Sequence, residues 1–209
     1  EWKNCEKIEK NLQKCDRIRI SNVGVRLCVR PSCTDTKGTA MRTITTVEMN
    51  PDSREEYLPG YTPQFPHIAS HIDGRLYQSD VAPWHWHESV ELFYVRRGSI
   101  LYRTPHAEHV VHADCGGMVN SHILHTTKIL DPTLDMALHL FSPSLVAGVA
   151  GGTVEQRYIR PLTADAGHEL ILLTPDDPAQ TETLRRIDES LRLDEAAFGH
   201  EMRLQAMLT

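Results

Sequence analysis

Short runs in which apolar and polar residues alternate fill the stretch from His67 to Phe141, and turn residues separate one run from the next. Alternation with a period of two is typical of strands that bury one face. We expect strands at 67–72, 75–80, 85–96, 99–104, 108–112, 116–120, 123–129 and 134–141. Strands this short, at an even spacing of about ten residues, predict an all-β sandwich or barrel.

The pattern after the predicted barrel becomes helical at Asp177-Pro178. Asp is a favoured N-cap residue and Pro a favoured first helical residue. Leu184, Ile187 and Leu191 then recur at helical spacing, which predicts an amphipathic helix. Their apolar stripe would pack either within the core of the same chain or against a second copy of it.

A second amphipathic helix is expected after Asp194, with Phe198 and Met202 on one face and Leu204 and Leu208 on another. No stop signal precedes the last residue, so we expect the sequence to be a piece of a longer chain. The expected fold class is therefore mainly β with C-terminal helices, a barrel followed by two helices.

Charge and cysteine usage separate the first 40 residues from the rest. Residues 1–40 carry nine Lys or Arg and five Asp or Glu, whereas residues 41–209 carry thirteen and twenty-three. Four of the five cysteines also lie in residues 1–40. We therefore expect an atypical extension at 1–40, foreign in origin or disordered, then a turn-rich arm at 41–66, the barrel at 67–176 and the helices at 177–209.

The composition argues against several classes of protein. No apolar run approaches the roughly 18 residues of a transmembrane helix, so no membrane contact is expected. The net charge of −6 argues against a nucleic-acid footprint over the whole surface. The early cysteines form no C-x-x-C pair, and only Cys115 follows, so neither a zinc finger nor a disulfide framework is expected. This usage is typical of a reducing compartment and predicts a cytoplasmic protein.

Residues that can bind a metal ion or a polar ligand are most concentrated at the start of the predicted strand 85–96. Successive side chains of a strand alternate between its faces, so His85, His87, Glu91 and Phe93 should share one face. A further histidine, His125, follows on a later strand, and the barrel could bring it to the same cavity. Two imidazoles, a carboxylate and a third imidazole would then converge on one interior site.

Three interpretations of this cluster remain open. Imidazole and carboxylate groups suit a divalent transition metal ion. The same groups could supply donors and acceptors to a polyhydroxylated ligand without any metal. They could also form a structural network, because a buried Glu91 needs a partner. Tyr102 is interpreted as a core residue with a bonded hydroxyl.

The residues also resemble a known family. His85, His87, Glu91 and the later Gly98 reproduce the first cupin motif, and His125 falls where the second motif has its histidine. The segments FPHIASH, HWHESVELFYVRRGSILYRT, ADCGGMVNSHILHT and LFSPSLVAGVAG…RYIRPL resemble the N-terminal effector-binding and dimerisation domain of AraC-type transcriptional regulators. Three positions depart from the cupin pattern: Ser79, Asn120 and His122 stand where it favours Gly, Pro and Gly.

The resemblance implies a cupin-like barrel of the double-stranded β-helix or jelly-roll type. It also implies a non-enzymatic role in which the barrel binds a small metabolite, such as a sugar, through His85, His87, Glu91, Phe93 and His125. The C-terminal helices would pair two copies into a homodimer. DNA would be bound only by a helix-turn-helix domain that the given sequence does not contain.

Two other functions remain open from the sequence. The first is a cupin metalloenzyme, a dioxygenase or a sugar isomerase, with His85, His87, Glu91 and His125 as ligands of a divalent metal ion. The second is a free-standing sugar-binding module. Metal content and the continuation of the reading frame would separate these from the regulator.

Overall fold

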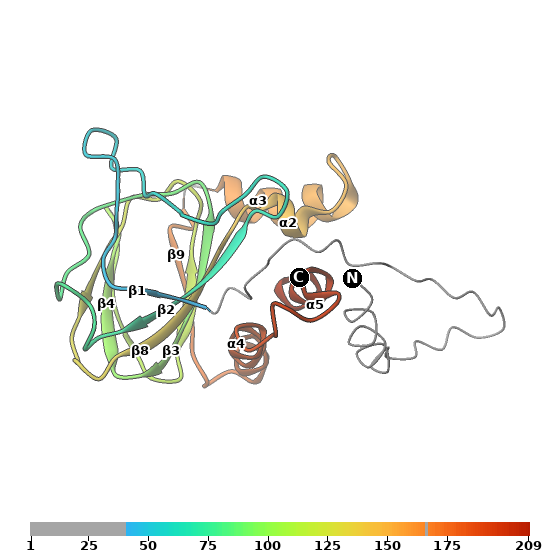
Figure 1. Cartoon of the computed structure of the whole chain (residues 1–209). Helices are drawn as coiled ribbons and strands as arrows, with labels where there is room; N and C mark the ends of the chain where they lie inside the picture. Colours follow the sequence, from blue (N-terminus) through green and yellow to red (C-terminus); the bar gives the residue numbers. More distant parts are fainter. Residues whose placement is uncertain (1–40, 166) are drawn as a thin grey trace, which may run out of the picture. The chain divides into compact units, whose positions relative to one another are not determined.

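The computed structural model describes residues 41–165 and 167–209, and the predicted extension at 1–40 lies outside the described residues. Two sheets face each other around one interior (Figure 1). The first has the order β1-β2-β8-β3-β6-β9, and the second the order β5-β4-β7. The strands are β1 (Arg42–Ile44), β2 (His67–Asp73), β3 (Val90–Arg97), β4 (Ser99–Arg103), β5 (Glu108–His112), β6 (Gly116–Val119), β7 (Thr126–Ile129), β8 (Asp135–Phe141) and β9 (Leu170–Leu173).

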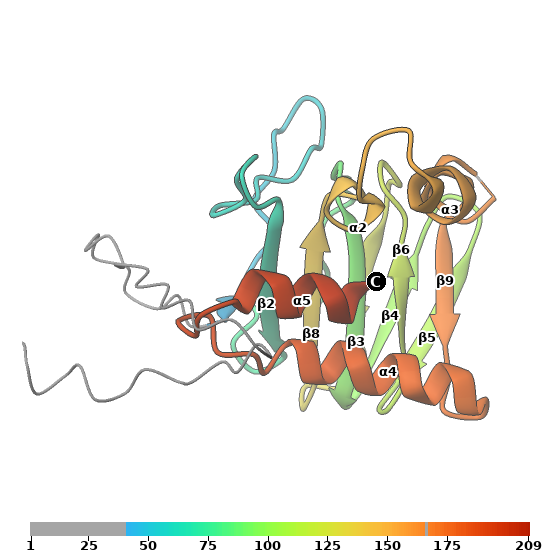
Figure 2. The same cartoon turned by 90° about the vertical axis from the view of Figure 1, so that its right-hand side faces the viewer.

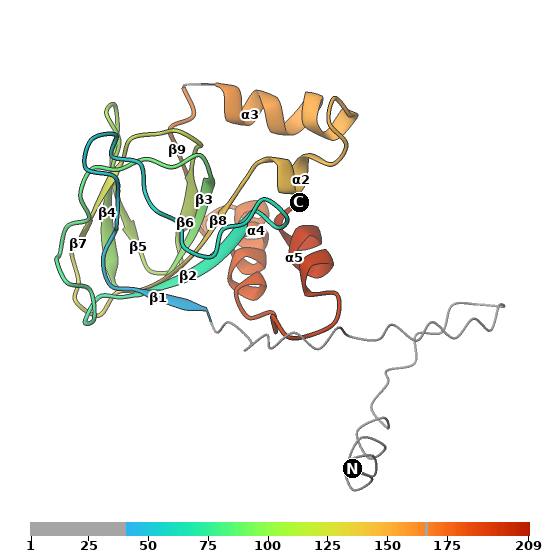
Figure 3. The same cartoon turned by 45° about the horizontal axis from the view of Figure 1, so that its top comes forward.

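The strand order identifies the barrel as a jelly roll of the cupin type, which confirms the predicted fold class. The chain crosses between the sheets from β3 to β4, from β5 to β6, from β6 to β7 and from β7 to β8. All paired strands are antiparallel except β1 and β2. The three-stranded sheet lies on the far side of the barrel from the C-terminal helices (Figure 3).

One predicted strand, 75–80, is absent, and another, 85–96, is interrupted. Residues 75–80 form turns, because the Asp73 carboxylate bonds the backbone and the guanidinium of Arg75 and so closes a turn after β2. The predicted strand 85–96 is broken by a bend at Glu88 and Ser89, and β3 begins only at Val90. The residues before the bend pair with the opposite sheet, through bridges from Val81 and His85 to the β7 region.

The barrel interior is filled by the inward residues of both sheets. Phe93 and Val95 of β3 and Leu138 and Leu140 of β8 are almost fully buried there, as their alternation predicts. Val110 of the edge strand β5 points outward and is 46% exposed.

Helix α4 (Pro178–Ser190) covers the outer face of the six-stranded sheet, together with α5 (His200–Leu208) (Figure 2). The predicted N-cap of α4 is confirmed, because the Asp177 carboxylate accepts a 2.8 Å hydrogen bond from the Ala179 backbone N–H. Ile187 and Leu191 pack with Ala137 of β8. The apolar stripe of Leu184, Ile187 and Leu191 is thus buried within one chain. The alternative that this stripe packs against a second copy is therefore wrong.

The second predicted helix begins later than expected. Turns occupy the residues after Asp194, and Gly199 at φ 77° precedes α5. Leu204 is buried as the inward residue of α5, whereas Phe198 and Met202 are exposed. The segment between β8 and β9 contains α2 (Ser144–Ala147), a π-helical turn η1 (Glu155–Ile159) and α3 (Arg160–Ala164).

The predicted arm at 41–66 contributes β1 and then lies across one opening of the barrel. Its backbone pairs with Trp86, through a bridge from Glu55 to that residue. In the described residues 41–165 and 167–209, none of the helices combines the length and the apolar character needed to cross a membrane.

Candidate functional site

Backbone pairing brings two of the predicted site histidines side by side. His85 and His125 exchange hydrogen bonds of 2.9 and 2.8 Å between backbone N–H and carbonyl groups, so their rings lie with centroids 4.3 Å apart. His87 follows on the same extended segment, and its ring centroid lies 5.1 Å from that of His125. Glu91 approaches from β3 in the opposite sheet. All four side chains are buried, although His85 and His87 do not lie on the strand of Glu91 as predicted, because the bend at Glu88 and Ser89 separates them from it.

The three imidazoles are held in one orientation by their own backbone. Each Nδ1 contacts a carbonyl oxygen two residues away, at 2.7 Å from Pro83 for His85, 2.9 Å from Ser89 for His87 and 2.9 Å from Ile123 for His125. A carbonyl only accepts, so each Nδ1 carries the donated proton. In the neutral ring, Nε2 then presents a lone pair, which is the form that binds metals and accepts hydrogen bonds.

Glu91 is the electrostatic centre of the site. Its Oε1 accepts a 2.8 Å hydrogen bond from the Tyr102 hydroxyl, and its Oε2 lies 3.5 Å from His87 Nε2 and 3.9 Å from His125 Nε2. Burial raises the pKa of Glu91, but His87, His125 and the Tyr102 hydroxyl outweigh burial and hold it at about 2. The site therefore keeps a buried carboxylate.

The pKa values of His87 and His125 shift in opposite directions. Burial lowers the pKa of His87, but the Glu91 carboxylate outweighs this and the net shift is upward. Burial and the neighbouring His85 lower the pKa of His125 to about 3. His125 is therefore neutral, whereas His87 is the imidazole that Glu91 can stabilise as a cation.

His87, Glu91 and His125 form the tight part of the cluster, with one donor atom from each within 4.8 Å of the others. His87 Nε2 is buried and has no hydrogen-bond partner in the described residues. Two imidazoles and a carboxylate with inward lone pairs fit a divalent transition metal ion. His85, predicted as a fourth member, lies beside this group and directs its Nε2 toward Glu56 at 3.9 Å.

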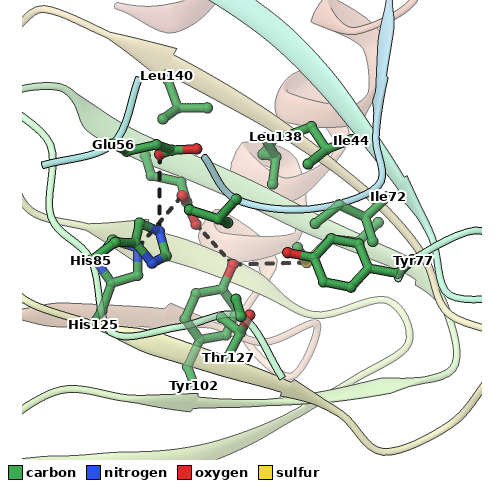
Figure 4. A pocket seen from close by; sticks show the side chains of 14 residues that line it. Ile44, Glu56, Ile72, Tyr77, His85, Tyr102, His125, Thr127, Leu138 and Leu140 are labelled. Carbon is green, nitrogen blue, oxygen red and sulfur yellow. Dashed lines mark hydrogen bonds and ion pairs between the residues drawn. The ribbon is translucent and has the colours of Figure 1, made fainter. Parts of the chain in front are cut away.

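A hollow with about 390 Å³ of empty space, open solvent included, is lined by His85, Glu91 and His125 but not by His87. Glu56, His85, His125 and Tyr102 lie on one side of it, and Leu138 lies across from them (Figure 4). The remaining lining residues are Ile44, Val47, Ile72, Tyr77, Ala82, Glu91, Thr127, Met136 and Leu140. The cavity thus has a polar wall of imidazole, carboxylate and hydroxyl groups and an apolar wall, the usual make-up of a small-molecule site.

Phe93 was predicted as a ligand contact, and the structure corrects this. Its ring is fully buried and stacks on Tyr102, with centroids 4.3 Å apart and an interplanar angle of 14°. It is absent from the cavity lining and supports Tyr102 from behind. The prediction that Tyr102 is a core residue with a bonded hydroxyl is confirmed.

Glu56 is a site residue that the sequence did not indicate. It comes from the arm, and burial raises the pKa of its carboxyl to about 7. No motif or periodicity marks it, because its place depends on backbone pairing between the arm and Trp86. Tyr77 was also missed, because its segment was expected to be a strand; burial raises its pKa to about 12.

One departure from the cupin pattern has a structural consequence. His122, which stands where the motif favours Gly, has φ 62°, in the left-handed region that Gly adopts without strain. Its ring stacks on Trp86 with centroids 5.6 Å apart. The strained turn is thus held by an aromatic contact outside the cavity.

No protein-family model matches this chain, and a search of curated proteins found no match. Several solved structures show a similar fold. ToxT from Vibrio cholerae aligns with a TM-score of 0.46 and 10% identity over 69% of this chain and 53% of ToxT. A cupin-2 domain protein from Shewanella frigidimarina aligns with a TM-score of 0.30 and 11% identity, over 40% of this chain and 76% of its own.

An HTH_3 family transcriptional regulator from Vibrio cholerae aligns with a TM-score of 0.33 and 12% identity, over 41% of this chain and 48% of its own. The chain spans about half the length of ToxT. These identities and TM-scores are low, so the fold assignment rests on the strand order and register described above.

Proposed function

We propose that this chain is the effector-sensing portion of an AraC-type transcriptional regulator, and that its barrel binds a small metabolite without turning it over. One observation carries the proposal. Two buried imidazoles, His85 and His125, and the buried Glu91 line one interior cavity, and a backbone carbonyl fixes each of the two imidazoles.

The cavity supports a small ligand. It is partly open to solvent, and its lining combines an apolar wall with a few polar groups, as small-molecule sites do. The apolar wall suits a hydrocarbon face, and the polar wall suits groups that donate hydrogen bonds. A sugar is one candidate, since its ring carries both kinds of surface.

Thermal unfolding of the purified chain with a library of sugars and other small metabolites tests the proposal. A ligand that binds only the folded state raises the melting temperature. We expect at least one compound to raise it, and His125→Gln, which changes a residue of the cavity lining, to abolish the increase. His109→Gln is the control, because His109 is exposed on β5. A library without any stabilising compound would count against effector sensing.

The regulator proposal also includes dimerisation and DNA binding. In it, the C-terminal helices pair two copies, and a helix-turn-helix domain belonging to a longer protein binds DNA. The excess of acidic residues in 41–209 favours leaving DNA binding to another domain. Reading the gene beyond the codon for Thr209 tests this part, and a frame that encodes no helix-turn-helix unit would refute it.

A second candidate function is a cupin metalloenzyme, favoured by the unpartnered His87 Nε2 beside Glu91 and His125. These residues, with His85 next to them, would hold a divalent ion, which would supply Lewis-acid or oxygen chemistry. Metal analysis of the purified protein separates the two candidates. Stoichiometric iron, manganese or zinc that is lost in His87→Ala and retained in His109→Ala would favour the enzyme.

A further inference from the structure

Glu56 and His85 form a pair of buried acceptors that face each other across a gap. Their Oε2 and Nε2 atoms lie 3.9 Å apart, and their side chains are only 10% and 5% exposed. His85 carries its proton on Nδ1, which contacts the Pro83 carbonyl. When the Glu56 carboxyl is ionised, above its pKa of about 7, both facing atoms are acceptors, and the distance between them is too long for a direct hydrogen bond. A group that donates to both atoms would satisfy them.

The arm holds Glu56 in this position through its backbone. The Glu56 N–H donates to the Trp86 carbonyl at 2.9 Å, and the Trp86 N–H donates to the Arg54 carbonyl at 3.1 Å. The Trp86 indole N–H also donates to the Ser53 carbonyl at 2.8 Å. Trp86 lies between His85 and His87 along the chain, so these bonds attach the arm directly to the segment that carries both histidines.

Glu56 also stands at a boundary between two hollows. It lines the interior cavity and a second hollow beneath the arm, together with Ile44 and Leu140. A ligand in the interior cavity would therefore meet Glu56 on the side nearest the arm. The paired acceptors face inward from the arm side, opposite the apolar wall formed by Leu138 and its neighbours (Figure 4).

The cavity lining is rich in acceptors and poor in positive charge. Among its lining residues, all within the described part of the chain, there is neither Lys nor Arg. Glu56 and Glu91 contribute carboxyl groups, and the Tyr102 hydroxyl already donates to Glu91. A ligand carboxylate or phosphate would meet like-charged groups here, whereas an ammonium group would meet complementary ones.

We propose that Glu56 and His85 are a subsite for the ammonium group of a small amphipathic amine, whose hydrocarbon part lies against the apolar wall. An ammonium nitrogen about 2.9 Å from each acceptor fits across their 3.9 Å separation. The inference rests on the proposed ligand-binding function and narrows it, since it excludes carboxylates of the same carbon skeleton.

The test compares butylamine, butanol and butyrate, which share a four-carbon chain, on the full 209-residue chain after treatment with EDTA. Affinities come from titrations followed by thermal unfolding. We expect butylamine to bind at least ten-fold more tightly than butanol, and butyrate to give no shift. Glu56→Gln keeps the size of the side chain and should cut the amine affinity ten-fold or more while sparing butanol.

Glu55→Gln is the matched control, because this neighbouring arm residue lines neither hollow. Its amine affinity should equal that of the wild type. Equal binding of amine and butyrate, or an unchanged amine preference in Glu56→Gln, would overturn the amine subsite and leave ligand binding by the barrel intact. Absence of binding by all three probes would overturn the amine subsite, whereas the outcome of the metabolite library decides the proposed function.

Discussion

The hydroxyl of Tyr102 on β4 donates a 2.8 Å hydrogen bond to Oε1 of Glu91 on β3. The two residues belong to facing sheets, so this bond ties the sheets together across the barrel interior. It also supplies the buried carboxylate with a donor that does not depend on a ligand. Burial and the Glu91 charge raise the pKa of Tyr102 well above its ordinary value, so the hydroxyl keeps its proton.

Tyr102→Phe removes this donor and leaves Glu91 short of a partner. We expect the free energy of unfolding to fall by about 1–3 kcal/mol, the usual cost of an unsatisfied buried group. Urea unfolding measures the change. Tyr158→Phe serves as a control, since Tyr158 is exposed, and a Tyr102→Phe protein as stable as this control would contradict the assigned bond.

Stability should fall as the pH is lowered from 7 to 5, because of two histidines between the barrel and α4. His67 Nε2 contacts His139 Nδ1 at 2.8 Å, and His139 Nε2 contacts Ser190 Oγ at 2.7 Å. Burial lowers the pKa of His67 to about 4 and that of His139 to about 3. Between these values and about 6.5, the unfolded chain binds protons that the folded chain does not.

The contribution of each histidine is therefore fully present above pH 6.5 and is lost as the pH falls toward 4 and 3. At pH 5 the loss is roughly 2 kcal/mol for each histidine. Urea unfolding at the two pH values measures it. His139→Asn should flatten the dependence relative to the wild type, whereas His109→Asn on β5 should not; equal slopes in all three proteins would contradict the assignment.

Gly117 lies where β6 passes between β3 and β9. A Cβ atom at this position would lie 2.4 Å from the Ile171 carbonyl oxygen and 2.9 Å from the Phe93 ring. We expect Gly117→Ala to destabilise the barrel by about 1–3 kcal/mol, because the backbone of β9 must shift. Gly167→Ala, in an exposed turn, should change the melting temperature little; comparable melting temperatures would show that β9 accommodates the extra carbon.

Phe198 and Met202 are 81% and 75% exposed beside the C-terminal helices. If these helices pair two copies of the chain, this apolar surface is available for the contact, whereas the Leu184 stripe is not. We expect the wild-type chain to sediment as a dimer and the double variant Phe198→Ser, Met202→Ser to shift toward monomer. Val110→Ser on β5 should remain dimeric, and a monomeric wild type would refute dimerisation of this chain.

The C-terminal helices show which structural features a local sequence pattern can predict and which it cannot. Asp177 followed by Pro178 marked the start of α4 correctly, because an N-cap bond and a fixed φ act within one turn. The apolar stripe of Leu184, Ile187 and Leu191 in this region did not indicate which surface it packs against. Its periodicity shows only that one face is apolar, and either the barrel or a second chain could cover that face.

Some residues of the candidate site were likewise predictable from the sequence, and others were not. Alternation along the chain correctly predicted that His85, His87 and Glu91 are buried, but it put them on one face of a single strand. The bend at Glu88 and Ser89 instead leaves the two histidines on a segment that pairs with the sheet opposite Glu91. Glu56 and the inward hydroxyl of Tyr77 depended on the tertiary structure. Their positions follow from hydrogen bonds between segments distant in the sequence, and from turns whose closure only the packed barrel determines.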